Sequence, residues 1–540
     1  MFWADEIAAR AAALVEASGS GATHVINDSK TPSGTVHVGS LRGPVIHDEI
    51  HRALRRAGHE ATFRYGVDDL DPMDSQALLT PDAVDRYMGV PLAHVPAPPG
   101  SDAPSYARHF VGELFLGTFE RLGIHPEIYW MSEVYAAGDM DRYIRAALDG
   151  GETIRTIYRE VSRVDKEAGW LPLSVICSTC GRVGTTIATD WDGETVAFEC
   201  RPDLVTWATG CGTSGRVSPF GGAAKLPFNV DWAAKWSLFG ITIEGCGKDL
   251  ATAGGSRDRS DAIARQVFGR EPPLNIPHEF INVGGRKMST SRGRGVPAHE
   301  IARVIPPDEL RLLFVRHRPN VAFDFDPDQT DAIPRQVDEF DRLAAATAGR
   351  PLRGELPADA ERIFAASLVD PGADVAAEAA AYRPAFAHLA LLAQLPDVDL
   401  PERAAAEKGE PLTERELVIL DSRTRAVRAW LDTYASPEAR IEVSRDSVPA
   451  VAQDLSAEQR AFLASLAGVL DGLPAPTWAG EALQAAVFST AKERGIGAGA
   501  GFAALYAAFL GRSSGPRAGW LLASLDRAFV IERLRAAGEA

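Results

Sequence analysis

One stretch of the sequence gathers residue types that can bind a phosphate. Residues Thr31–Arg42 carry one imidazole, His37, close to Gly34 and Gly39 and to the hydroxyl of Ser40. A strand-like segment precedes them and a helical pattern follows, so His37 is expected at a helix N-terminus, where free N–H groups and the helix dipole favour an anion. Glycines leave room there for close approach of a ligand. By itself such a turn is more often a simple tight turn.

A second stretch, Gly285–Gly293, joins basic and hydroxyl side chains in one short loop. It contains Lys287, Ser289 and Ser291, and glycines flank it. A lysine with two hydroxyls suits the phosphates of a nucleoside triphosphate. Together the two stretches predict a nucleotide site built from distant parts of the chain.

The segments around His37 predict a strand, a helix and a second strand. Thr23–Asn27 is rich in β-branched residues and indicates a strand. Val38–Ala57 has apolar residues at helical spacing, and Thr62–Gly66 again indicates a strand. This order predicts a right-handed βαβ unit of a parallel sheet. Asp68 and Asp69 follow the second strand, at the edge where open α/β sheets bind ligands. An aspartate-rich turn is the alternative.

Four cysteines in a β-rich segment could hold a metal ion. Cys177 and Cys180 form a tight knuckle, and Cys200 and Cys211 follow a hairpin-like stretch. Two cysteine pairs separated by a β ribbon are typical of a zinc ribbon, because tetrahedral zinc needs four ligands brought together by turns. The zinc would be structural, since four thiolates leave no open position. Free core cysteines are the alternative, and Cys246 is expected to be one.

Composition indicates an ordinary globular protein of several domains. The chain has 540 residues and a formal net charge of −17, and about 150 residues per domain gives two to four domains. No apolar run reaches the roughly 18 residues of a membrane span, and the acidic start does not fit a signal peptide. We therefore expect a cytoplasmic protein without a membrane or DNA partner, because the net charge argues against a non-specific nucleic-acid coat.

The His37 and Lys287 stretches resemble the two signatures of class I aminoacyl-tRNA synthetases. His37–Ser40 resembles the HIGH motif and Lys287–Ser291 the KMSKS motif, in the expected order. The whole chain resembles the archaeal-type class I lysyl-tRNA synthetases. The similar segments are Pro32–Gly39, Asp68–Asp69, Ser105–His109, Val230–Trp236, Gly247–Ser256, Lys287–Ser289 and Leu510–Pro516.

The resemblance implies an α/β architecture followed by helices. A Rossmann-type nucleotide-binding catalytic domain is expected at 1–305, with 71–228 as an insertion whose part 173–225 is zinc-ribbon-like. A connecting helical segment at 306–345 and an all-α, anticodon-binding C-terminal domain at 346–540 would follow. We expect ATP as substrate with Mg²⁺, a structural Zn²⁺, and tRNA, with tRNA-Lys as the expected partner.

The resemblance also implies the roles of individual residues. The reaction would be activation of an amino acid as its adenylate and transfer to the 2′-hydroxyl of the terminal adenosine of tRNA. The catalytic group would be His37, Ser40, Lys287, Ser289 and Ser291. ATP would be bound by Pro32, Ser33, Gly34, Gly39, Gly247, Asp249, Lys287 and Met288. The amino acid would be bound by Ser33, Gly34, Asp68, Asp231, Trp232 and Arg257.

Several positions depart from the family pattern. Ser40 stands where Asn or His is usual, and Thr290 replaces the second lysine of KMSKS. In the amino-acid pocket Gly43 stands where the family has a glutamate that meets the substrate ammonium, Leu250 replaces a histidine, and Arg257 replaces a tyrosine. We therefore expect another acid to meet the ammonium, with Asp68, Asp69 and Asp231 as candidates. Arg257 would repel lysine if it pointed inward and would be a surface charge if it pointed outward.

Three functions stay open at this point. The first is a lysyl-tRNA synthetase with a rebuilt pocket. The second is a synthetase-like enzyme for another amino acid, and the third is a catalytically silent tRNA-binding paralogue. The joint presence of His37, Lys287 and Asp249 argues against the third, because a silent site has no chemical need for them.

Overall fold

The computed structural model divides into two compact units. Unit 1 comprises residues 1–302, 307–326 and 353–374, and unit 2 comprises 303–306, 327–352 and 375–540. The structure describes residues 1–18, 23–74, 81–287, 295–329, 331–352, 354–395 and 398–539, and of residues 81, 286, 287 and 476 it describes the backbone only. The domain boundaries expected at 305/306 and 345/346 stay predictions.

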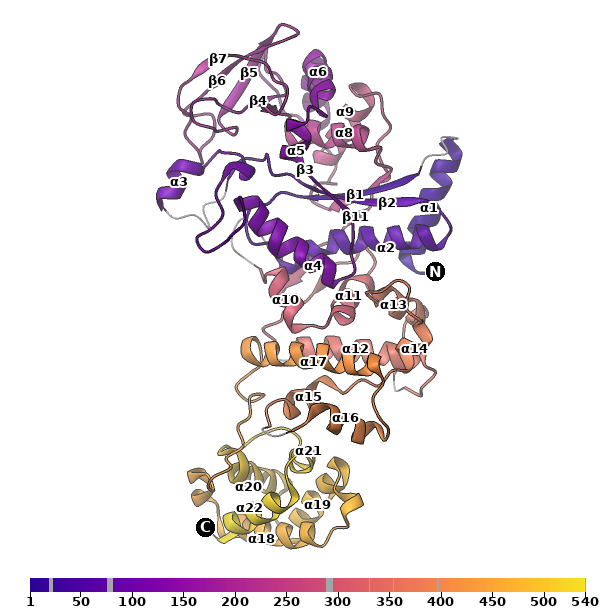
Figure 1. Ribbon diagram of the computed structural model, residues 1–540, viewed down its shortest axis with the longest axis vertical. Helices are drawn as coiled ribbons and strands as arrows, with labels where there is room; N and C mark the ends of the chain where they lie inside the picture. Colours follow the sequence, from indigo (N-terminus) through magenta and orange to yellow (C-terminus); the bar gives the residue numbers. More distant parts are fainter. Residues whose placement is uncertain are drawn as a thin grey trace. The chain divides into compact units, whose positions relative to one another are not determined.

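A parallel sheet of four strands lies at the centre of unit 1 (Figure 1). Its order is β3 (Glu127–Trp130), β2 (Ala61–Val67), β1 (His24–Lys30) and β9 (Ile243–Glu244). In the β1–β2 pair, Asp28 lies opposite Tyr65. Helix α2 (Arg42–Arg56) connects β1 to β2, which confirms the predicted βαβ unit.

Helices cover both faces of this sheet. Figure 1 shows α2 on one side of β1 and β2, and α8 (Phe228–Phe239) with α9 (Ser256–Gln266) on the other. The α2 face is apolar, with Val45, Ile46, Ile50 and Leu54 at most 1% exposed. Burial of such side chains stabilises each by about 1.5–3 kcal/mol, so the helical pattern of the sequence fixes where α2 packs.

The rest of unit 1 surrounds this core. Its other helices are α1 (Trp3–Ser18), α3 (Pro81–Tyr87), α4 (Leu116–Arg121), α5 (Met131–Ala136), α6 (Asp141–Asp149), α7 (Gly151–Ser162), α11 (Pro307–Val315) and α13 (Ala360–Ser367), while α10 (Ala298–Val304) ends in unit 2. Its other strands are β4 (Ser174–Val175), β5 (Thr186–Trp191), β6 (Val196–Cys200), β7 (Ser214–Val217), β8 (Ala224–Lys225), β10 (Cys246–Gly247), β11 (Pro277–His278), β12 (Ile281–Val283), β13 (Arg286–Lys287) and β14 (Phe323–Asp324).

Among its described residues, unit 2 contains helices joined by loops and no strand. Its helices are α12 (Ala332–Thr347), α14 (Val375–Ala380), α15 (Phe386–Leu392), α16 (Leu400–Lys408), α17 (Glu414–Thr433), α18 (Ala457–Asp471), α19 (Gly480–Glu493), α20 (Ala498–Leu510), α21 (Ala518–Ala523) and α22 (Arg527–Glu539). An apolar core joins the last five of these, with Phe462, Leu466 and Leu505 fully buried. In the part of the chain that the structure describes, no helix combines the length and apolar character needed to cross a bilayer.

Candidate active site

A cavity of about 290 Å³ opens beside the carboxyl ends of β1, β2 and β9. Open parallel sheets bind ligands at this edge. Its wall comes from the β1 end, from the first residues of α2, and from the segments around β9 and β10. The lining residues are Asp28, Ser29, Lys30, Thr31, Gly39, Ser40, Gly43, Tyr65, Asp68, Phe228, Trp232, Glu244, Gly245, Cys246, Gly247, Leu250 and His278.

The segment that follows the second motif runs against the first motif, whose Gly39 and Ser40 line this cavity. His37 forms an isolated antiparallel bridge with Pro297. On either side of it, the Val38 amide donates to the Val296 carbonyl at 2.8 Å, and the Ala298 amide donates to the Val36 carbonyl at 2.9 Å. The chain that follows the second motif therefore runs against the first. Gly34 in the same loop has a φ of 139°, a conformation that favours glycine.

Part of the second motif lies outside the described residues. Lys287 is described as a backbone position in β13, opposite Asn282 of β12. Met288, Ser289 and Ser291, which the sequence assigned to ATP, fall in the range 288–294, outside the described residues. Their roles stay predictions.

The other predicted ATP and catalytic residues fall in three places. Gly39, Ser40 and Gly247 line the cavity. Pro32, Ser33, Gly34 and His37 belong to the loop between β1 and the helical turn Val38–Leu41, where Pro32 and Gly34 are buried. Asp249 is exposed, and a Cβ built on Gly247 would lie 2.7 Å from its Oδ1.

Asp68 and Asp231 are not the uncommitted acids that the sequence suggested. Asp68 lines the cavity, but its Oδ1 accepts from Lys235 Nζ at 2.6 Å. Asp231 lies 3.4 Å from the same ammonium and accepts from the Tyr135 hydroxyl at 2.5 Å. Although burial opposes the charged form, the two carboxylates raise the pKa of Lys235 well above its ordinary value. The chain's own lysine thus takes the place of an external cation.

Asp69 also serves the fold. Its carboxylate accepts from the backbone amide and the hydroxyl of Ser132, at 2.8 and 2.5 Å, in the first turn of α5. Burial raises the pKa of Asp69 to about 6, against the effect of these hydrogen bonds. An acceptor for a free amide in the first turn is a typical helix cap, so Asp69 positions α5.

Arg257 points neither into the cavity nor to solvent. It is 2% exposed, and its guanidinium donates to Asp261 at 2.7 Å and to the carbonyls of Glu244 and Pro273 at 3.0 and 2.5 Å. It also lies 4.6 Å from the ring centre of Trp236. Arg257 therefore supports the end of β9. The sequence had offered two positions for it, inside the pocket or on the surface, and both were wrong.

Asp28 is a cavity residue that the sequence reasoning missed. It lies on β1 and faces Gly43 of α2, where a Cβ would come 2.5 Å from Asp28 Oδ2. His47 Nδ1 lies 3.5 Å from the same oxygen and 2.8 Å from the Gly43 carbonyl. Burial opposes protonation of His47, but Asp28 and these hydrogen bonds raise its pKa on balance. The contact between Asp28 and Gly43 becomes visible only when α2 packs against β1.

The four cysteines of the β ribbon converge. Their Sγ atoms all lie within 4.8 Å of one another, with Cys177 to Cys211 at 3.6 Å and Cys180 to Cys200 at 3.7 Å. Four sulfurs about 2.3 Å from a tetrahedral zinc would be separated by about 3.8 Å. The cluster thus fits a zinc ion, while Cys246 is buried elsewhere, as predicted.

Comparison with known proteins agrees with this geometry. Residues 1–367 match the family model of class I (K) tRNA synthetases. The chain belongs to this family. Residues 431–538 of this class I synthetase match a second model, an anticodon binding domain, and they lie within unit 2.

Curated relatives of this class I synthetase match it along nearly its full length. A lysine–tRNA ligase of Archaeoglobus fulgidus is 34% identical and covers 99% of this chain and 100% of the relative. A lysine–tRNA ligase of Methanosarcina barkeri is 33% identical, with 99% and 97% covered. Lysine–tRNA ligase 1 of Methanosarcina acetivorans is 32% identical, with 99% and 98% covered.

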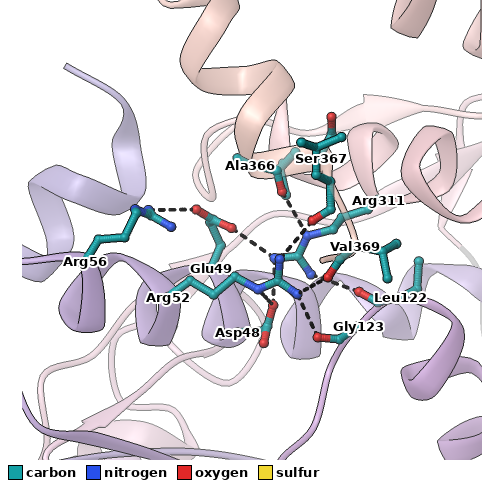
Figure 2. Close-up of polar contacts among 12 residues, drawn as sticks. Asp48, Glu49, Arg52, Arg56, Leu122, Gly123, Arg311, Ala366, Ser367 and Val369 are labelled. Atoms are coloured by element: carbon teal, nitrogen blue, oxygen red, sulfur yellow. Dashed lines mark hydrogen bonds and ion pairs between the residues drawn. The ribbon is translucent and has the colours of Figure 1, made fainter. Parts of the chain in front are cut away.

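A buried charge network anchors α2 of this synthetase (Figure 2). Arg311 of α11 donates to Asp48 at 2.6 Å and Glu49 at 2.9 Å, and Arg52 pairs with Asp48 at 2.8 Å. Arg311 also donates to the Ala366 carbonyl near the end of α13. Because α2 begins just after the His37 loop, this network fixes the helix that carries the cavity wall.

Proposed function

We propose that the protein is a lysine–tRNA ligase that forms lysyl-tRNA, AMP and pyrophosphate from ATP, lysine and tRNA-Lys through a lysyl-adenylate. The similarity to a curated lysine–tRNA ligase over 99% of this chain and 100% of that relative carries the proposal. The cavity at the carboxyl ends of the parallel strands, lined by Gly39 and Ser40 of the first motif, supports it.

The first step would join lysine to AMP in this cavity. The carboxylate of lysine attacks the α-phosphate of ATP, the bond to the β-phosphate breaks, and pyrophosphate leaves. His37 and Ser40 would donate to the phosphate, while Lys287, Ser289 and Ser291 would hold the charge that builds on pyrophosphate. Donors already in place stabilise such charge most, since they need no reorganisation. ATP would enter as its magnesium complex, and this ion would share the pyrophosphate charge.

The second step would transfer lysine to tRNA. The 2′-hydroxyl of the terminal adenosine attacks the lysyl carbonyl, its proton leaves, and AMP departs. Residues 431–538, which match an anticodon binding domain, would bind the anticodon arm, and the segment 71–228 would lie in the part of the enzyme that receives the acceptor stem. We place the protein in the cytoplasm, where tRNA and ATP are found together.

The four cysteines would hold a structural zinc ion in the β5–β7 ribbon. Zinc supplies binding energy that folds small β ribbons. Cys177, Cys180, Cys200 and Cys211 would be its ligands, because their sulfur separations match tetrahedral coordination.

Aminoacylation of tRNA tests the proposed function. We expect the purified protein with ATP to attach labelled lysine to tRNA-Lys, and substitution of exposed basic residues in 431–538 to raise the KM for tRNA while leaving ATP–pyrophosphate exchange intact. Formation of another aminoacyl-tRNA without lysyl-tRNA would contradict the proposal. Retention of tRNA without any aminoacylation would favour a silent paralogue.

A further inference from the structure

We propose that Asp28 binds the ammonium at the end of the amino-acid side chain, so that this carboxylate selects a cationic substrate. The inference rests on the proposed function and names the residue that would give it its specificity. It follows from the position of Asp28, from the charges around it and from the state of the other acids in the cavity.

The space for the Asp28 carboxylate exists because residue 43 is a glycine. Gly43 lies in the first turn of α2, and a Cβ there would come 2.5 Å from Asp28 Oδ2. The Asp28 side chain is 15% exposed and lines the cavity. It is therefore largely withdrawn from water yet still open to a ligand.

The groups that touch Asp28 form no charged pair with it, although Lys30, two residues along β1, feels its charge: burial lowers the pKa of Lys30, and Asp28 raises it against that larger effect. Oδ1 accepts from the Ser29 amide at 2.8 Å, and His47 Nδ1 lies 3.5 Å from Oδ2. Against the effect of burial, Asp28 raises the pKa of His47. The Gly245 amide, however, donates to His47 Nε2 at 2.8 Å, so in this geometry Nε2 carries no proton and the ring is neutral, with its single proton on Nδ1. Within the described ranges, Asp28 forms no ion pair with a lysine or an arginine.

The other acids of the cavity already have partners. Asp68 is paired with Lys235 at 2.6 Å. Glu244 accepts from Asn27 at 2.7 Å and from the indole N–H of Trp236, and it is 2% exposed. Asp28 is thus a cavity acid that forms no ion pair with a lysine or an arginine and is more open to a ligand than Glu244, with 15% of its side chain exposed against 2% for Glu244. A cation would stabilise its carboxylate, because a buried charge without a partner is costly.

Lys30 indicates which end of the substrate reaches Asp28. It lines the same cavity, two residues further along β1, and alternate strand residues point to the same face. Lys30 therefore lies nearer the His37 loop, where the substrate carboxylate must meet the α-phosphate. Asp28, further from that loop, would receive the distal ammonium.

ATP–pyrophosphate exchange with lysine and with norleucine, which has no side-chain ammonium, tests the assignment. Asp28→Asn should raise the KM for lysine by about thirtyfold or more, as for loss of one partner of a buried charge pair. The preference for lysine over norleucine should fall by the same factor. Asp139→Asn, at an exposed acid outside the cavity, should change neither quantity.

Gly43→Ala is an independent variant that keeps every charge. Its methyl group should displace the Asp28 carboxylate and move the lysine-to-norleucine preference in the same direction, even if Asp28→Asn does not fold. Wild-type exchange with lysine, together with unchanged preferences in both variants, would overturn the role of Asp28 and leave the proposed function standing.

Other wild-type results separate the two claims. Exchange with arginine but not lysine, lost in Asp28→Asn, would support Asp28 and overturn the proposed function. Exchange only with an uncharged or acidic amino acid would overturn both.

Discussion

The guanidinium of Arg311 lies 2.9 Å from the carboxylate of Glu49, and both side chains are fully buried. Glu49 belongs to α2 and also accepts from Arg56 and Arg362, each at 3.0 Å. Arg311 of α11 and Arg362 of α13 therefore hold α2 to these two helices, while Arg56 belongs to α2 itself. Ion pairs with α11 and α13 thus fix the position of the helix that begins after the His37 loop.

Removing Arg311 should destabilise unit 1 strongly. Arg311→Met removes a cationic partner from both Asp48 and Glu49. Removing one partner of a buried ion pair lowers the free energy of unfolding by about 3–5 kcal/mol. Arg265→Met is the matched control, since Arg265 and Glu271 are 51% and 82% exposed and such pairs contribute about 0–1 kcal/mol. Urea unfolding should separate the two variants clearly, and equal midpoints would contradict the structural role of Arg311.

The cysteine cluster predicts metal content. Purified protein should carry about one zinc per chain, and a Cys177→Ser/Cys180→Ser variant should lose it. Chelation should also make the segment 173–225 sensitive to protease, because metal binding contributes folding energy there. Cys246→Ser is the control, since this buried thiol lies outside the cluster. Full zinc in the double variant would rule out these ligands.

His37 and Lys287 should matter more for the rate than for ATP binding. His37→Ala and Lys287→Ala should each lower the rate of adenylate formation by about a hundredfold or more, as for loss of one preorganised donor. His125→Ala and Lys166→Ala, outside the cavity, are the controls. Rapid-quench measurement of adenylate with saturating ATP tests this, and a wild-type rate in both active-site variants would contradict the roles given to His37 and Lys287.

Glu416 predicts a pH-dependent effect in unit 2. Its carboxylate accepts from the amides of Thr413 and Tyr382, each at 2.8 Å, and from Lys408 at 2.7 Å. Burial opposes the charged form, but these bonds lower the pKa of Glu416 to about 2. Ionised Glu416 therefore stabilises the fold above its unfolded pKa of about 4.3, and this contribution disappears as the pH falls toward 2.

Hydrogen exchange in α17 measures this contribution. Glu416→Gln should speed exchange of the first α17 amides at pH 7, for a loss of about 1–2 kcal/mol as for a helix cap. The difference from wild type should be smaller at pH 4. Glu414→Gln, an exposed acid in the same turn, should have little effect. If the difference in exchange rate between Glu416→Gln and wild type grew as the pH fell, it would contradict a stabilising role of ionised Glu416.

Local patterns in the sequence were enough for the core of unit 1. The strand before His37 and the helix after it have clear apolar periods, so the parallel βαβ unit could be predicted. The four cysteines could be predicted to form one cluster, because two cysteine pairs separated by a β ribbon are typical of a zinc site. The family resemblance assigned Gly39, Ser40, Trp232 and Gly247 to the site, and all four line the cavity.

Contacts between distant segments could not be predicted. Whether Asp68 is free depends on Lys235, which joins it only when α8 packs on the sheet. Arg257 could be inside or outside until its carbonyl partners were known. Asp28 looked like any strand residue, since its neighbour Gly43 comes from the next helix. Periodicity reports which face is buried, and it does not report which charges meet there.

The central claim is activation of lysine, and amino-acid-dependent ATP–pyrophosphate exchange tests it most directly. Each of the twenty standard amino acids is supplied in turn to the purified full-length protein, with ATP and labelled pyrophosphate. We predict exchange with lysine, well above that with any other amino acid. Exchange driven by glutamate, aspartate or arginine, with none from lysine, would contradict the account.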